Sequence, residues 1–78
     1  MIFLIDYDRK AGKIVMFRRF TDEQRKRAEE ARLELDLQLN RTRTEREVVL
    51  LEAATEGALR RTHRRYFESL EQLELLPS

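Results

Sequence analysis

The sequence predicts a small α+β domain with the element order ββαβα, a three-stranded antiparallel sheet in the order 2-1-3, and two helices on one face of that sheet. Three observations lead to this fold. Two β-type runs are joined by a short polar turn, a long segment rich in Ala, Glu and Arg opens with a capping box, and an apolar run leads into a second capped segment. All 78 residues are expected to form a single domain.

The first two predicted strands are residues 2–7 and 14–20, which form a hairpin. Between them, Asp8 can start a turn and Gly12 can take the positive φ that leads back into a strand. Because side chains alternate along a strand, apolar residues fall on both faces of this hairpin. The chain's own helices are expected to cover one face, so the other face needs a second cover.

The next segment, residues 21–40, is predicted to be a helix, because Thr21 and Gln24 fit a capping box. Its packing stripe toward the sheet consists of Ala28, Ala31, Leu35 and Leu39. Residues 33–39 also alternate between apolar and polar types, which is a strand pattern. Helix is the preferred prediction, because this stretch contains no β-branched residue and continues a helix-forming run.

The third predicted strand, residues 47–53, contains the densest apolar run of the chain. A second helix is expected to begin after Thr55, its N-cap, and to extend as far as Leu76, because Pro77 follows. We place the third strand beside the first, since this puts the wholly apolar first strand at the centre. A position beside the second strand would instead create a parallel pair.

Composition limits the classes of function. Sixteen basic and fifteen acidic residues give a net charge of +1, so any basic binding site must be local rather than a property of the whole molecule. The absence of cysteine excludes disulfides and cysteine zinc sites and fits a cytoplasmic location. The apolar N-terminal run ends at Asp6 and lacks a basic flank, which indicates a strand rather than a signal peptide. No apolar run is long enough to span a membrane, so no membrane partner is expected.

The sequence predicts no catalytic residue, no metal site and no cofactor, and hence a non-enzymatic protein. The lone histidine, His63, has no orienting carboxylate, nucleophile or set of further metal ligands visible near it in the sequence. Its ring is expected to be half-buried against the sheet. Gly12 and Gly57 are isolated, which leaves no phosphate-cradling loop.

A cationic face is predicted on the outward side of the second helix. It consists of Arg60, Arg61, Arg64 and Arg65. Guanidinium groups suit the recognition of phosphate or carboxylate. However, Glu56 precedes Arg60 by four residues and Glu68 follows Arg64 by four, so ion pairs along the helix are expected to use part of this charge. A solvated or partner-facing surface is preferred, and nucleic-acid binding through this face or through the basic hairpin is the alternative.

The chain has more apolar surface than two helices in a small monomer can cover. The candidate dimer surface comprises one free sheet face, the outer leucines of the first helix and the C-terminal leucines: Phe3, Val15, Phe17, Leu33, Leu37, Leu75 and Leu76. Exposed patches of this kind usually mark protein contacts, and two-fold homodimers are the commonest result. The sequence therefore predicts a homodimeric interaction module with an unidentified protein partner.

Overall fold

The computed structural model describes residues 1–67, which form one sheet covered by helices. The strands are β1 (Ile2–Asp8), β2 (Lys13–Phe20) and β3 (Glu47–Glu52). The helices are α1 (Arg25–Arg41), preceded by the 3-10 helix η1 (Asp22–Gln24), and α2 (Glu56–Thr62), followed by the 3-10 helix η2 (Arg64–Tyr66). Both strand pairs are antiparallel, and the strand order is β2-β1-β3. The predicted class, element order and strand order are confirmed.

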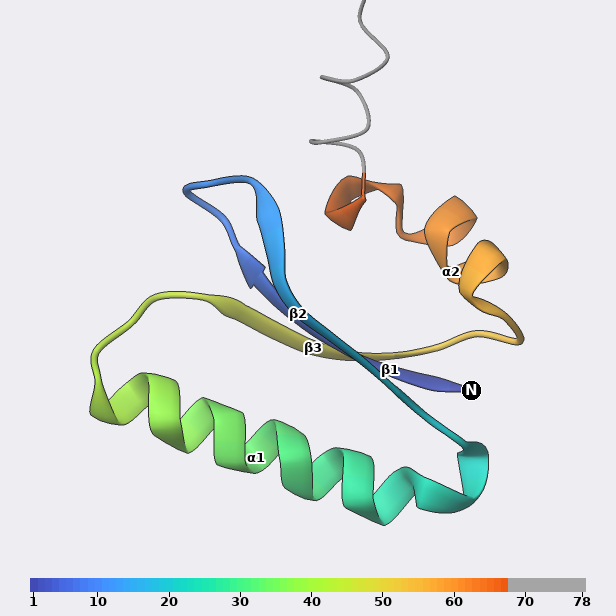
Figure 1. The fold of residues 1–78 in the computed structure, drawn as a ribbon, viewed down its shortest axis with the longest axis horizontal. Coiled ribbons are helices and arrows are strands. Elements are labelled where there is room, and N and C mark those ends of the chain that lie inside the picture. Colours follow the sequence, from blue (N-terminus) through green and yellow to red (C-terminus); the bar gives the residue numbers. More distant parts are fainter. Residues whose placement is uncertain (68–78) are drawn as a thin grey trace, which may run out of the picture.

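The two helices cover opposite faces of the sheet, with α1 on one side and α2 on the other (Figure 1). The cluster on the α1 side is built on Ile2, Leu4, Phe20 and Ala28, and the cluster on the α2 side is built on Phe3, Ile5, Leu59 and Tyr66. The prediction that both helices pack on one face was therefore wrong. The physical reason is β1, whose residues from Ile2 to Ile5 are all apolar and at most 2% exposed. A strand that is apolar on both sides needs a cover on both sides.

The hairpin turn forms as predicted. The carboxylate of Asp8 accepts hydrogen bonds from the backbone N–H groups of Lys10 and Ala11, both at 3.0 Å, and Gly12 has a φ of 66°. The pairing of β1 with β2 contains one irregularity. Asp6 pairs with Met16 and Tyr7 with Ile14, so Val15 has no partner across the pair and forms a β-bulge.

Helix α1 includes residues 33–39, so the preference for helix over strand in that stretch is confirmed. The capping box also forms, because the Gln24 side chain accepts a hydrogen bond from the N–H of Thr21 at 3.0 Å. Ala28 and Leu39 are buried on the predicted stripe. No helix within residues 1–67 is long and apolar enough to cross a membrane.

Helix α2 is much shorter than predicted. Thr55 caps it as expected, accepting a hydrogen bond from the N–H of Ala58 at 3.0 Å, but the helix ends at Thr62. His63 leaves the helical conformation, with φ −125° and ψ 51°. The chain then turns back over the sheet and brings Tyr66 against Tyr7, with ring centroids 5.2 Å apart. Burial of this large ring offsets the loss of helical hydrogen bonds. The rest of the predicted helix, residues 68–76, lies outside the described part of the chain.

Leu59 is the residue that fixes α2 to the sheet, and its side chain is fully buried. We expect Leu59→Ala to lower the free energy of unfolding by about 2–5 kcal/mol, because it leaves a cavity between α2 and β1. Chemical denaturation at one fixed protein concentration measures this loss. The control is Arg61→Ala, an exposed position of the same helix, which should change the free energy by less than about 0.5 kcal/mol. A loss below about 1 kcal/mol for Leu59→Ala would contradict the packing of α2 on the sheet.

Candidate functional site

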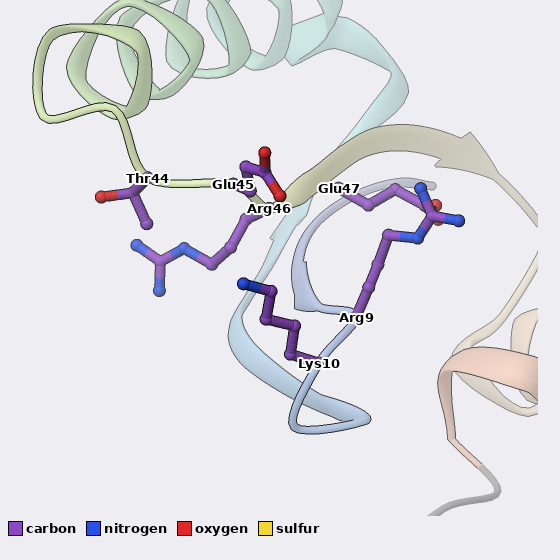
Figure 2. Close-up of a pocket in the computed structure, with 6 residues that line it drawn as sticks. All are labelled: Arg9, Lys10, Thr44, Glu45, Arg46 and Glu47. Atoms are coloured by element: carbon purple, nitrogen blue, oxygen red, sulfur yellow. The ribbon is translucent and has the colours of Figure 1, made fainter.

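A charged groove lies at one end of the sheet, where the turn between β1 and β2 approaches the loop between α1 and β3. It encloses about 610 Å³ and is lined by Arg9, Lys10, Thr44, Glu45, Arg46 and Glu47 (Figure 2). Figure 2 shows the Arg9 side chain directed toward Glu47, while Lys10 and Arg46 extend from opposite walls toward the same side of the opening. Positive charge from two separate segments therefore meets in this groove.

The turn wall of the groove is held by Asp8. Its two hydrogen bonds to backbone N–H groups, that from Ala11 above all, lower the pKa of this carboxyl below its usual value. The turn is also closed by a hydrogen bond of 2.8 Å from the N–H of Gly12 to the carbonyl of Asp8. These bonds fix the backbone from which the side chains of Arg9 and Lys10 extend.

The loop wall is a Schellman motif at the end of α1. The N–H of Thr44 donates to the carbonyl of Leu39 at 2.9 Å, and the N–H of Arg43 donates to the carbonyl of Asn40 at 3.2 Å. Arg43 occupies the left-handed position of this motif with a φ of 54°. Glycine is the usual residue there, because a side chain at positive φ costs about 1 kcal/mol. The loop thus accepts backbone strain at an arginine that directly precedes Thr44, the first lining residue of this wall.

A buried ion pair positions Arg46. Its Nε lies 3.3 Å from Oδ1 of Asp6, whose side chain is only 3% exposed. Burial raises the pKa of Asp6, and the positive charge of Arg46 opposes this shift. This pair was not predicted from the sequence. The available signal was an aspartate directly after five apolar residues, inside the strand predicted to lie at the centre of the sheet.

Glu47 forms a second network that was not predicted from the sequence. Its Oε2 accepts hydrogen bonds from the Arg65 guanidinium and the Tyr66 hydroxyl, and its Oε1 lies 3.9 Å from Arg9. These hydrogen bonds, the one from Tyr66 first, lower the pKa of Glu47. Burial, followed by the hydrogen bond with Glu47, raises the pKa of Tyr66. The network ties η2 to the start of β3.

The four predicted arginines do not form one cationic face, because α2 ends before the last two. Arg60 lies 3.5 Å from Glu56 and stacks on the ring of Phe67 at 4.6 Å. Arg65 is held by Glu47 and Tyr66. Arg61 and Arg64 are exposed. The ion pair between Arg60 and Glu56 was predicted, and it uses charge that a ligand would otherwise contact.

His63 is half-buried, and its Nδ1 lies 2.9 Å from the hydroxyl of the preceding residue, Thr62. Within residues 1–67 there is no group of three or more His, Cys, Asp or Glu side chains that could hold a metal ion.

The predicted dimer surface is divided by the structure. Phe3 is fully buried and Phe17 is half-buried beneath the α2 side of the sheet, so the expected free sheet face is not free and this part of the prediction was wrong. Val15, Leu33 and Leu37 are 44%, 58% and 52% exposed. The two C-terminal leucines, Leu75 and Leu76, lie outside the described residues.

A second groove runs between α1 and the outer edge of the sheet. It encloses about 480 Å³ and is lined by Arg25, Glu29, Arg32, Leu33, Asp36 and Leu50. The apolar residues of β3, from Val48 to Leu51, are only half-buried, because β3 is an edge strand. We call the combination of β3, Leu33 and Leu37 the edge surface. It joins exposed leucines of α1 to a half-covered apolar strand.

No protein-family model, curated protein or solved structure matches this chain.

Glu47 should make stability depend on pH in a defined direction. Its pKa is lowered in the folded state from the ordinary value of 4.5, so its contribution is complete above about pH 4.5 and is lost as the pH falls through the folded-state pKa. We expect Glu47→Gln to lower the free energy of unfolding by about 1–3 kcal/mol at pH 7 and to flatten its decline below pH 4.5. Denaturation across this pH range measures both effects. The control is Glu23→Gln, at an exposed position in η1, and an equal effect of the two variants would contradict the network.

Proposed function

We propose that this protein is a non-enzymatic protein-interaction module that acts as a homodimer in the cytoplasm. The observation that carries the proposal is the edge surface, where Leu33 and Leu37 are more than half exposed beside a strand of four half-buried apolar residues. Monomeric proteins rarely leave a contiguous apolar surface of this kind uncovered. The cysteine-free composition supports the cytoplasmic part of the proposal.

The chain's size supports the same proposal. A domain of 78 residues buries only about 60–65% of the surface that its unfolded chain exposes, which leaves a small margin of stability. Each Å² of apolar surface removed from water contributes about 25 cal/mol before the costs of association. Covering the edge surface with a second copy would therefore stabilise both the dimer and the fold of each protomer.

The chemistry of the charged groove supports a binding role. Its side chains are three cations, a threonine and two carboxylates, and one of these carboxylates, Glu47, is already engaged by Arg65 and Tyr66. Such a set can bind an anion.

Charge placed on the edge surface should dissociate the dimer. We expect the wild-type protein to sediment as a dimer at tens of micromolar and Leu33→Glu/Leu37→Glu to sediment as the 9.4 kDa monomer, because burying two carboxylates against leucines is costly. Sedimentation equilibrium measures the two masses. The control is Arg27→Glu, which changes the charge by the same amount in a third groove, beside Arg18, Glu30 and Glu34, and should remain dimeric. A folded wild-type monomer at these concentrations would refute the proposal.

Nucleic-acid binding is the second candidate, and the charged groove favours it more than α2 does. The turn and the loop that meet there contain four basic residues, of which Arg9, Lys10 and Arg46 line the groove and Arg43 lies in the loop wall. The arginine at the left-handed position of the loop adds to this, because strained backbone is often retained where the side chain has a function.

A labelled single-stranded RNA tests this candidate by fluorescence anisotropy. We expect Arg9→Gln/Lys10→Gln, which removes two cations that line the groove, to weaken binding about tenfold or more. The salt dependence should fall as well, because a protein with fewer cations displaces fewer counterions from the RNA. Arg61→Gln, an exposed arginine on α2, is the control and should change the affinity least. If the control weakens binding as much as the groove variant does, the groove is not the site.

A further inference from the structure

The two edges of the sheet are built differently. Strand β2 carries a β-bulge at Val15 and the charged residues Lys13, Arg18 and Arg19, all features that prevent another strand from pairing with it. Strand β3 has neither a bulge nor a charge between its terminal glutamates, and its four central residues are Val-Val-Leu-Leu. Of the two edges of the sheet that residues 1–67 form, β3 is therefore the one suited to accept a further strand.

The backbone groups that β3 offers can be identified from its pairing with β1. The N–H of Ala53 donates to the carbonyl of Met1 at 3.1 Å, and Ile2 lies opposite Glu52. In an antiparallel pair, residues that exchange hydrogen bonds alternate with residues that do not. Leu51 and Val49 therefore bond to β1. The N–H and C=O groups of the alternate residues point outward instead, and these residues are Val48, Leu50 and Glu52.

We propose that two copies of the chain join β3 to β3 in antiparallel fashion about a two-fold axis through Leu50, giving a continuous six-stranded sheet. This inference rests on the proposed homodimer and names its contact. In this register Leu50 exchanges two hydrogen bonds with Leu50 of the second copy, and Val48 and Glu52 pair with each other across the axis. The outward N–H and C=O groups of these three residues in each strand then bond to the same three residues of the other copy.

The side chains also agree with this register. Directly opposed residues of an antiparallel pair lie on the same face, so Leu50 meets Leu50 on the α1 side and Val49 meets Leu51 on the α2 side. A two-fold axis through Val49 would also pair side chains that lie on the same face of the sheet, but it would place Glu52 opposite Arg46. That residue lies outside β3 and is held by Asp6, so Glu52 would lack a strand partner.

The helices fit beside one another in this arrangement. Helix α1 packs against both β1 and β3, since Ala28 and Ala31 lie in one cluster with Leu4 and Leu50. A helix centred between these strands is about 5 Å from the two-fold axis, because neighbouring strands are about 4.8 Å apart. Two such helices are then about 10 Å apart, which is the ordinary distance of packed helices. Leu33, which lines the same groove as Leu50, faces the second copy.

The charges that border this contact are balanced. The groove beside Leu50 is lined by two basic and two acidic side chains, Arg25, Arg32, Glu29 and Asp36. The proposed axis passes through Leu50, so the groove of one copy lies beside the groove of the other. Because both signs are present in equal number, these side chains bring no net charge to the contact.

Disulfide trapping tests the register directly, because the chain has no cysteine of its own. We expect Leu50→Cys to form a disulfide-linked dimer under mild oxidation, since paired residues across the axis have Cα atoms about 5.5 Å apart. Val49→Cys is the matched control and should remain reduced, because its partner is Leu51. Crosslinking of the Val49 variant in place of the Leu50 variant would overturn the proposed register.

Amide exchange in the wild-type protein gives an independent test that needs no substitution. We expect the N–H groups of Val48, Leu50 and Glu52 to exchange at least about tenfold more slowly when the protein is dimeric than when it is diluted to monomer, because they are bonded only in the dimer. Val49 and Leu51 bond to β1 in both states and should change less. A dimer without slowed exchange and without the Leu50 crosslink refutes this contact and leaves the proposed homodimer intact. A wild-type monomer refutes both.

Discussion

The structure depends on the central strand, which is apolar on both of its faces. Leu4 faces α1 and Phe3 faces α2, and both side chains are fully buried. A strand of this composition is stable only between two covering layers. The chain therefore places one helix on each side of the sheet, with each helix connected to the end of an outer strand. The fold therefore has three layers, with the sheet between α1 on one side and α2 on the other.

This use of the helices leaves the edges of the sheet without cover by α1 or α2. A chain with both helices on one face would have an open face, and an apolar second face would then be the natural contact for a partner. With both faces covered, the apolar surface of residues 1–67 that stays accessible includes β3 and the outer side of α1, where Leu33 and Leu37 are exposed, as well as Val15 on β2. The same constraint that buries β1 thus moves the surface available for association from a face to an edge.

The sequence was sufficient for features that depend on local signals. The turn at Asp8 and Gly12, the caps at Thr21 and Thr55 and the helical state of residues 33–39 follow from neighbouring residues and are present in the structure. The strand order follows from the apolar character of β1. The side of the sheet on which α2 packs could not be predicted in this way, because a short loop after an edge strand can turn to either face.

The charged networks could not be predicted because they join distant segments. Asp6 meets Arg46, and Glu47 meets Arg65 and Tyr66, only after the sheet has formed and after α2 has ended early. A continuous helix, as the periodicity indicated, would place Arg65 on its outward face. The early end of α2 brings this arginine to Glu47 at the start of β3 instead, so part of the predicted ligand surface is used in a contact within the chain.

The edge contact and the charged groove are compatible within one assembly. The groove lies beside Glu47, at the first end of β3, whereas the proposed axis passes through Leu50. Antiparallel pairing about that axis puts the two grooves at opposite ends of the joined strands, about 20 Å apart for six residues of strand. A small anion could occupy only one groove, whereas an extended polyanion could contact both and gain from their linkage. Association through β3 would therefore strengthen any binding of a long anionic ligand without changing either groove.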